Sequence, residues 1–293
     1  MGESTKNRFG ARIIGIVTAS NRSDPAIWEA LAGCDCAELR ADGFARDSIP
    51  REARAFRREC LQRLGRPLET LLTLRLERDG GAWPDVQAGL RGPVWESLGL
   101  DGSDPACDWV DVEVEEMGAL PARAKALLSS GAAKLLLSHH DMRKSLSGEG
   151  LRNLLRDMQA YRPAGMKFAV TCGSRDELLD LLAFAREVAA ATANGCVLSM
   201  GRAGRASRVL APLLGCPLTY GYLTGGAVAP GQLSASELGA FYRGLDDRDP
   251  RGPDRDGGRG GGDADSRLLD WAEARVSETL RRSVSGEGDL LAE

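Results

Sequence analysis

The only two histidines of the chain are adjacent, His139 and His140, at the end of the apolar run "KLLLSHHDM" (134–142). Imidazole is the side chain that most readily exchanges a proton near neutral pH, so either ring is a candidate general acid or base. Successive side chains of a strand point to opposite faces, and therefore at most one of the two points into a site. Alternation alone does not select which one, and a structural or solvated histidine is the alternative for each.

A single lysine interrupts the apolar segment "MKFAVTC" (166–172). A buried amine is costly unless it is paired, neutralised or used, and desolvation lowers its pKa and frees the lone pair that a Schiff-base nucleophile needs. Lys167 is therefore a candidate covalent catalyst. The alternative is that Lys167 marks the exposed rim of its strand and extends to water.

Three arginines follow three different apolar segments: Arg40, Arg75 and Arg208. Guanidinium groups bind carboxylates and phosphates with paired hydrogen bonds, so their shared position predicts an anionic ligand. If the ligand reacts through a cationic imine, we expect these charges to gather at a carboxylate of the substrate, away from Lys167. The alternative is a set of separate ion pairs with Glu38, Asp42 or Asp79, each of which lies near one of the arginines in sequence.

The seven cysteines have no spacing typical of a disulfide framework, and most lie in or beside apolar runs. We expect buried thiols in a reducing compartment. Cys34 and Cys36 would lie on one side of a strand, but no second Cys or His pair completes a metal site, so we expect no metal.

Eight short apolar or β-branched runs recur along the chain, and segments with apolar residues at intervals of three and four separate them. One such segment, "DELLDLLAFAREVAAATA" (176–193), is typical of a helix packed on a sheet. Another, 234–245, opens with Ser234 followed three residues later by Glu237, a capping-box pattern. This rhythm over about 235 residues predicts an α/β fold, a (β/α)8 barrel. A doubly wound sheet is less favoured, because the first strand–helix turn has no glycine-rich dinucleotide fingerprint. The predicted strands are 11–19, 34–42, 70–77, 107–115, 134–140, 166–172, 195–201 and 217–223.

The composition changes near Gly244, and we predict four parts. Residues 1–245 form the catalytic barrel, and 246–266, rich in Gly, Asp and Arg, form a disordered linker. Residues 267–284 form an amphipathic helix, and 285–293 a tail. The net charge of −4 predicts no attraction to nucleic acid. The chain has no apolar run of membrane-spanning length and no signal-peptide core near its start, so we expect no membrane association and a cytoplasmic location.

Seven segments together resemble the type I 3-dehydroquinate dehydratases, the Schiff-base enzymes of the shikimate pathway. The resemblance covers about residues 11–245, with the segments in the order and spacing typical of that family. The segments are "ELRAD" (38–42), "TLRLERDGG" (73–81), "SHHDM" (138–142), "MKFAVT" (166–171), "SMGRAGRASR" (199–208), "LTYGYL" (218–223) and "APGQLS" (229–234).

The resemblance implies roles for particular residues. His140, followed by an acidic and a bulky apolar residue, matches the general acid and base, and Lys167 matches the lysine that condenses with the ketone of 3-dehydroquinate. Asp79 stands where the family has a glutamate that orients the histidine. The implied substrate-binding residues are Glu38, Arg40, Arg75, Arg208, which binds the carboxylate, and Gln232. No metal or organic cofactor is implied, and the glycine-rich segment 223–228 would act as a mobile lid.

Two departures from the family pattern leave alternatives open. Asp79 is one methylene shorter than glutamate, and Val228 stands where the family commonly has a serine that binds the substrate. A class I aldolase acting on a sugar phosphate is one alternative, because the segment 201–208 lies where barrels often bind phosphate. A catalytically weak relative that binds quinate or shikimate is another. We expect a small-molecule substrate as the partner. The sequence leaves open whether the chain forms a homodimer.

Overall fold

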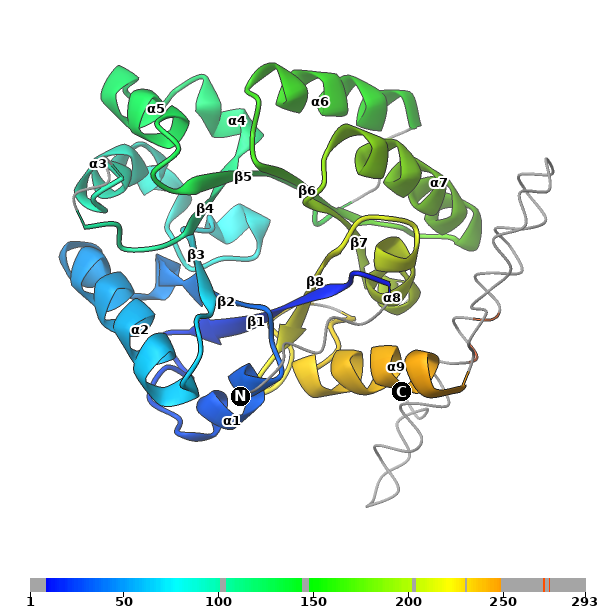
Figure 1. The fold of residues 1–293 in the computed structure, drawn as a ribbon. Coiled ribbons are helices and arrows are strands. Elements are labelled where there is room, and N and C mark those ends of the chain that lie inside the picture. The colour runs from blue at the N-terminus through cyan, green and yellow to red at the C-terminus, as the bar shows by residue number, and fades with distance from the viewer. Residues whose placement is uncertain are drawn as a thin grey trace.

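In the computed structural model, eight parallel strands alternate with helices and form a nearly closed barrel (Figure 1). The structure describes residues 9–100, 104–143, 148–201, 204–229 and 231–248, together with residues 271 and 274. The strands follow one another around the sheet in the order β7-β6-β5-β4-β3-β2-β1-β8, and every hydrogen-bonded pair is parallel. The predicted (β/α)8 fold is therefore confirmed.

All eight predicted strands are present within one or two residues at most ends. Their bounds are β1 Arg12–Thr18, β2 Cys36–Arg40, β3 Glu69–Thr73, β4 Trp109–Glu113, β5 Lys134–His140, β6 Gly165–Thr171, β7 Gly195–Met200 and β8 Leu218–Tyr222. The third differs most from the prediction, because β3 ends at Thr73 and the chain then turns into a loop rather than continuing to 77. Arg75 and Asp79 thus lie on a loop at the barrel mouth.

Helices surround the sheet, as Figure 1 shows. Their bounds are α1 Ala26–Ala32, α2 Ile49–Leu64, α3 Arg91–Ser97, α4 Val114–Met117, α5 Ala122–Ser129, α6 Gly148–Ala160, α7 Arg175–Ala191, α8 Arg205–Leu213 and α9 Ala235–Arg248. Short 3-10 turns occupy η1 Ala41–Gly43, η2 Arg46–Ser48, η3 Glu77–Asp79 and η4 Asp85–Leu90.

The two helices singled out in the sequence form for the expected reasons. The N-cap of helix α7 is Ser174, whose hydroxyl accepts a hydrogen bond from the Glu177 amide at 3.2 Å, and the apolar stripe of the helix is buried. Helix α9 begins with the predicted capping box. Ser234 N donates to Glu237 Oε2 at 2.6 Å, and Glu237 N donates back to Ser234 Oγ at 3.1 Å.

Apolar side chains form two layers, one on each side of the sheet. The larger lies between the strands and the surrounding helices, and the smaller lies inside the barrel, where Ile14, Leu71, Trp109, Leu136 and Leu198 are among its members. The interior is thus a packed core, and its end at the carboxyl termini of the strands carries a pocket with polar side chains. All seven cysteines are buried thiols, as expected.

The C-terminal predictions fall almost entirely outside the described residues, so the linker 246–266, the helix 267–284 and the tail stay predictions. One contact is described there: the Trp271 ring lies edge-on to Phe241 of α9, with 6.5 Å between ring centroids. Within the described ranges, no helix combines the length and the apolar character needed to span a membrane.

Candidate active site

One pocket at the carboxyl ends of the strands contains every residue that the sequence assigned to the site. Its empty volume is about 560 Å³, part of it open to solvent. The eight assigned residues that line it are Glu38, Arg40, Arg75, Asp79, His140, Lys167, Arg208 and Gln232. They come from six different strands or the loops after them, so the barrel brings together residues up to 194 positions apart (38 to 232).

Lys167 lies inside the barrel and does not extend to bulk water, because its residue surface is only 6% exposed. The parallel register places it beside Ser138 of β5 and Cys196 of β7. Its Nζ lies 3.4 Å from Asp111 Oδ2 and 4.0 Å from the centroid of the Tyr220 ring. A carboxylate and an aromatic face both stabilise a cation at this nitrogen, whether ammonium or iminium.

Asp111 of β4 is the counter-ion that sequence reasoning missed. Its Oδ1 accepts a 2.5 Å hydrogen bond from Ser138 Oγ, and its Oδ2 pairs with Arg75 Nη2 at 2.8 Å. Burial alone would raise the pKa of Asp111, but the positive charges of Arg75 and Lys167 outweigh it and lower the pKa below its usual value. The signal was present in "WVDVE", where two acidic residues alternate with apolar ones in a buried strand.

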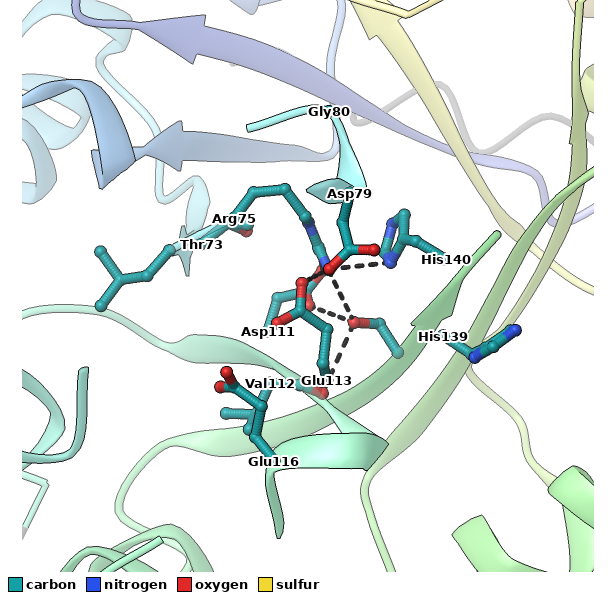
Figure 2. Close-up of polar contacts among 12 residues, drawn as sticks. Thr73, Arg75, Asp79, Gly80, Asp111, Val112, Glu113, Glu116, His139 and His140 are labelled. Atoms are coloured by element: carbon teal, nitrogen blue, oxygen red, sulfur yellow. Dashed lines mark hydrogen bonds and ion pairs between the residues drawn. The ribbon is translucent and has the colours of Figure 1, made fainter. Parts of the chain in front are cut away.

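The two histidines point in opposite directions, as Figure 2 shows. His139 contacts Glu115 of α4, with 2.5 Å between Nδ1 and Oε1, and so belongs to the layer outside the barrel. His140 lines the pocket, and Arg75 Nη1 lies 2.8 Å from its Nδ1. Because a guanidinium has no acceptor, Nδ1 accepts this bond, and the neutral ring carries its proton on Nε2. Burial, with the nearby charges of Arg75 and Lys167, lowers the pKa of His140 well below the usual value.

Asp79 reaches the pocket from the loop after β3. This loop folds tightly because Gly80 has a φ of +79° and because a Cβ on Gly81 would lie 2.0 Å from the Arg75 carbonyl oxygen. Figure 2 shows the Asp79 side chain on the same side of Arg75 as His140, but among the described residues no hydrogen bond joins Asp79 to His140. Burial, reinforced by the charge of Glu113, raises the pKa of Asp79 to about 6.

Arg40 and Glu38, both on β2, are occupied by contacts within the protein. Arg40 forms a paired contact with Asp42, at 2.9 and 3.0 Å, and donates to the Gly80 carbonyl at 3.3 Å. Glu38 Oε1 accepts a 2.6 Å bond from Thr73. The Arg40–Asp42 pair matches the alternative interpretation of ion pairing, and it ties the loop after β2 to the loop that carries Asp79.

Arg208 of α8 is the arginine that remains available for an anion. It is 2% exposed, its Nε donates to the Gly231 carbonyl at 3.2 Å, and its buried Nη2 has no hydrogen-bond partner among the described residues. Burial lowers the pKa of Arg208 to about 10. The expectation that all three arginines gather at one anion away from Lys167 is therefore not met, since Arg75 pairs with Asp111, the counter-ion of that lysine.

Gln232 and Val228 contact each other at the rim of the pocket. The Val228 amide donates to Gln232 Oε1 at 3.0 Å, which leaves the amide NH₂ of Gln232 as its donor group. Over the described residues, no cluster of three or more His, Cys, Asp or Glu side chains has the arrangement of a metal site.

The chain is similar to known proteins in its family pattern, in sequence and in structure. A family model described as type I 3-dehydroquinase matches residues 13–249. The 3-dehydroquinate dehydratase of Methanosarcina acetivorans is 30% identical over 210 residues, 70% of this chain and 83% of that protein. The structure of 3-dehydroquinate dehydratase from Enterococcus faecalis is similar, with a TM-score of 0.58, 27% identity and coverage of 72% of this chain and 88% of that one. The Geobacillus kaustophilus 3-dehydroquinate dehydratase has the same fold, with a TM-score of 0.68, 22% identity and coverage of 82% and 92%.

Proposed function

The chain belongs to the type I 3-dehydroquinase family, and from that premise we propose that it dehydrates 3-dehydroquinate to 3-dehydroshikimate through a Schiff base on Lys167. The observation that carries this proposal is the content of one pocket. A buried lysine, a neutral histidine and a buried guanidinium without an anionic partner among the described residues line the same cavity.

The first step joins the amine to the ketone. Lys167 Nζ gives up one proton and attacks C3, and the ketone oxygen leaves as water with that proton and a second one from the nitrogen, which gives a protonated imine. Asp111 Oδ2, 3.4 Å from Nζ, supplies the negative charge that this cation needs in a buried site. The ring face of Tyr220, whose centroid lies 4.0 Å from the same nitrogen, also stabilises this positive charge.

The second step moves a proton through His140. The protonated imine acidifies the C2 proton, which an unprotonated ring nitrogen of His140 removes to give an enamine. The lowered pKa of His140 keeps the ring neutral and able to accept that proton. The same imidazole then returns the proton to the C1 hydroxyl, which leaves as water, and hydrolysis of the new imine releases the product and the free amine.

The tautomer of His140 sets a condition on this step. In the substrate-free structure Nδ1 accepts from Arg75, so Nε2 holds the proton. A base acting through Nε2 needs the other tautomer, with Nδ1–H donated to an acceptor. Asp79 lines the same pocket, and we assign it that task when it is ionised, above its pKa of about 6.

Arg208 binds the substrate carboxylate in this proposal. Its Nη2 is buried without a hydrogen-bond partner among the described residues, and an anion satisfies both its charge and its free donor. Arg75, Glu38, Arg40 and Gln232 are left to order the site and hold hydroxyl groups.

The test combines turnover with chemical trapping. The purified full chain is given 3-dehydroquinate, and the enone absorbance of 3-dehydroshikimate is followed. A second sample is reduced with borohydride during turnover, and peptide mapping locates the added mass. Product formation with an adduct on Lys167 supports the proposal. Binding of quinate or shikimate with neither product nor adduct would favour a binding protein, and cleavage of a sugar phosphate without dehydration would favour an aldolase.

A further inference from the structure

Arg91, the first residue of α3, is a buried cation that the proposed chemistry does not use. It is 1% exposed, although it follows the exposed 3-10 turn η4. Burial lowers its pKa, with the charge of Glu113 opposing that effect. A fully buried guanidinium is stabilised only by several good contacts, and these contacts define what Arg91 does.

Two of the contacts that Arg91 makes lie at the peptide before Arg75 or at Glu113, which Arg75 also binds. Arg91 Nη1 donates to the carbonyl of Leu74 at 2.6 Å and to Glu113 Oε2 at 2.7 Å. Its Nη2 pairs with Glu116 of α4. Arg91 therefore holds both the peptide that precedes Arg75 and the carboxylate that Arg75 binds.

Glu113 is shared by two arginines, one on each oxygen. Arg75 Nη1 contacts Oε1 at 2.5 Å, while Arg91 holds Oε2. Arg75 consequently meets Glu113 through one oxygen only. The rest of its guanidinium serves the pocket: Nη2 pairs with Asp111 at 2.8 Å, and Nη1 also contacts Ser138 at 3.2 Å and His140 Nδ1 at 2.8 Å. Figure 2 shows these contacts converging on Arg75.

We propose that Arg91 is a positioning residue that keeps the Arg75 guanidinium on His140 and Asp111 by occupying the second oxygen of Glu113 and the Leu74 carbonyl. Without Arg91, both oxygens of Glu113 are open to the Arg75 fork, and a paired contact with one carboxylate is the geometry that a guanidinium prefers. Arg75 engaged in that way turns away from His140 Nδ1 and from Asp111. The His140 ring then loses the donor that fixes its substrate-free tautomer, and the counter-ion of Lys167 loses a fixed partner.

The effect expected on turnover rests on the proposed function, whereas the effect expected on the NMR signals does not. The chain has only two histidines, so ¹⁵N labelling of histidine gives signals from two rings. In the wild type, the His140 signals are expected to report an unprotonated Nδ1 that accepts a hydrogen bond, with the proton on Nε2. Arg91→Met should change the His140 Nδ1 signal and leave His139, which contacts Glu115, unchanged.

Turnover should follow the same pattern. Arg91→Met is expected to lower kcat roughly 10- to 100-fold, because Asp111, the counter-ion of Lys167, loses its charge-assisted contact with Arg75. Arg91→Lys should recover most of the wild-type His140 signal and turnover, because an ammonium still occupies Glu113 Oε2. Arg12→Met is the matched control, since Arg12 also pairs with a carboxylate on the barrel, at 2.6 Å from Glu69, but at the opposite end.

Two outcomes would overturn the proposal: a folded Arg91→Met protein whose His140 signals equal those of the wild type, or an Arg91→Lys protein no closer to the wild type than Arg91→Met. If Arg91→Met does not fold, Arg91→Met combined with Glu116→Gln removes one of the buried carboxylates and is measured in its place. A wild type that neither turns over 3-dehydroquinate nor forms an adduct would reject the proposed function, while the ¹⁵N comparison would still decide the role of Arg91.

Discussion

Two lysines at opposite ends of the barrel have the same kinds of neighbour and differ in burial. Lys134, at the start of β5, lies 2.6 Å from Glu69 and 4.9 Å from the Trp109 ring, and its side chain is 51% exposed. Lys167 lies 3.4 Å from Asp111 and 4.0 Å from the Tyr220 ring, with a side chain only 8% exposed. Water screens the first pair, whereas the second depends on its protein neighbours alone.

The same contrast extends to the arginines. At the amino-terminal end, Arg12 pairs with Glu69 and donates to Asn194, and its side chain is 31% exposed. At the carboxyl-terminal end, Arg208 is 2% exposed and has a buried nitrogen without a hydrogen-bond partner among the described residues. Charges at the amino-terminal end are satisfied by the protein and by water. For Arg208 at the other end, we propose that the anionic partner is a ligand.

The largest difference should separate the two lysines. Lys167→Ala removes the nucleophile, and we expect turnover to fall by roughly 10³-fold or more and the borohydride adduct to disappear. Lys134→Ala removes only a screened ion pair and should leave turnover within about twofold. The enone assay and intact mass after reduction check both. Retained adduct formation in Lys167→Ala would reject its assigned role.

The next largest difference lies within β5, between its two faces. His140→Ala should lower kcat by roughly 10²- to 10⁴-fold, as expected for loss of a general acid and base, with the adduct on Lys167 still forming. His139→Ala removes a contact outside the barrel and should change kcat little. The opposite pattern, with His139 essential and His140 dispensable, would show that the assignment is wrong.

The two arginines should differ in the kinetic constant that they change. Arg208→Met should raise KM by roughly 10- to 100-fold, because the substrate carboxylate loses a charge-assisted contact. Arg12→Met should leave KM unchanged and lower the free energy of unfolding by about 0–1 kcal/mol, the usual range for a partly exposed pair. Steady-state kinetics and urea unfolding measure the two effects. Equal KM values in the two variants would argue against a carboxylate site at Arg208.

Asp79 should give the site a pH dependence near 6. Its pKa is raised to about 6, so the carboxylate that we propose accepts a hydrogen bond from His140 is present above that pH and is lost as the pH falls through it. The wild-type kcat profile should therefore fall on its acid side near pH 6. In Asp79→Asn, kcat should be lower throughout and that limb should move to lower pH, because only His140, with its still lower pKa, remains to titrate. An unchanged acid limb in Asp79→Asn would assign it to another group.

The smallest effect concerns stability at the amino-terminal end. Burial would raise the pKa of Glu69, but hydrogen bonds from Lys134 and Trp109 outweigh it and lower the pKa. A lowered carboxyl pKa contributes stability above the unfolded-state value near 4.3, and this is lost as the pH falls through the folded-state value. Glu69→Gln should cost about 1 kcal/mol or less at pH 7, allowing for solvent screening, and nothing at strongly acidic pH, with turnover unchanged. Unfolding curves at the two pH values test this.

Much of the fold could be predicted from the sequence because the signals are local. The eight apolar runs become the eight strands, and the Ser234–Glu237 spacing becomes a capping box, since a cap involves only neighbouring residues. The end of β3 was misjudged because "TLLTLRLE" alternates like a strand through Glu77, whereas Gly80 and Gly81 turn the chain back onto Arg75.

The sequence by itself determined which residues share the pocket, because residues that follow parallel strands meet at one end of a barrel. The order of the predicted strands and the resemblance of their motifs to a family placed His140, Lys167 and Arg208 there. The pocket contains all three. Only the tertiary structure decided how their charges are paired. Asp111 and Glu113 bind Arg75, and Arg91 binds Glu113, through contacts that span 22 to 38 residues of sequence, and no local pattern states which carboxylate an arginine binds. The energy of interaction between two buried charges depends on their distance and on the exclusion of solvent, and both are set only when the barrel closes.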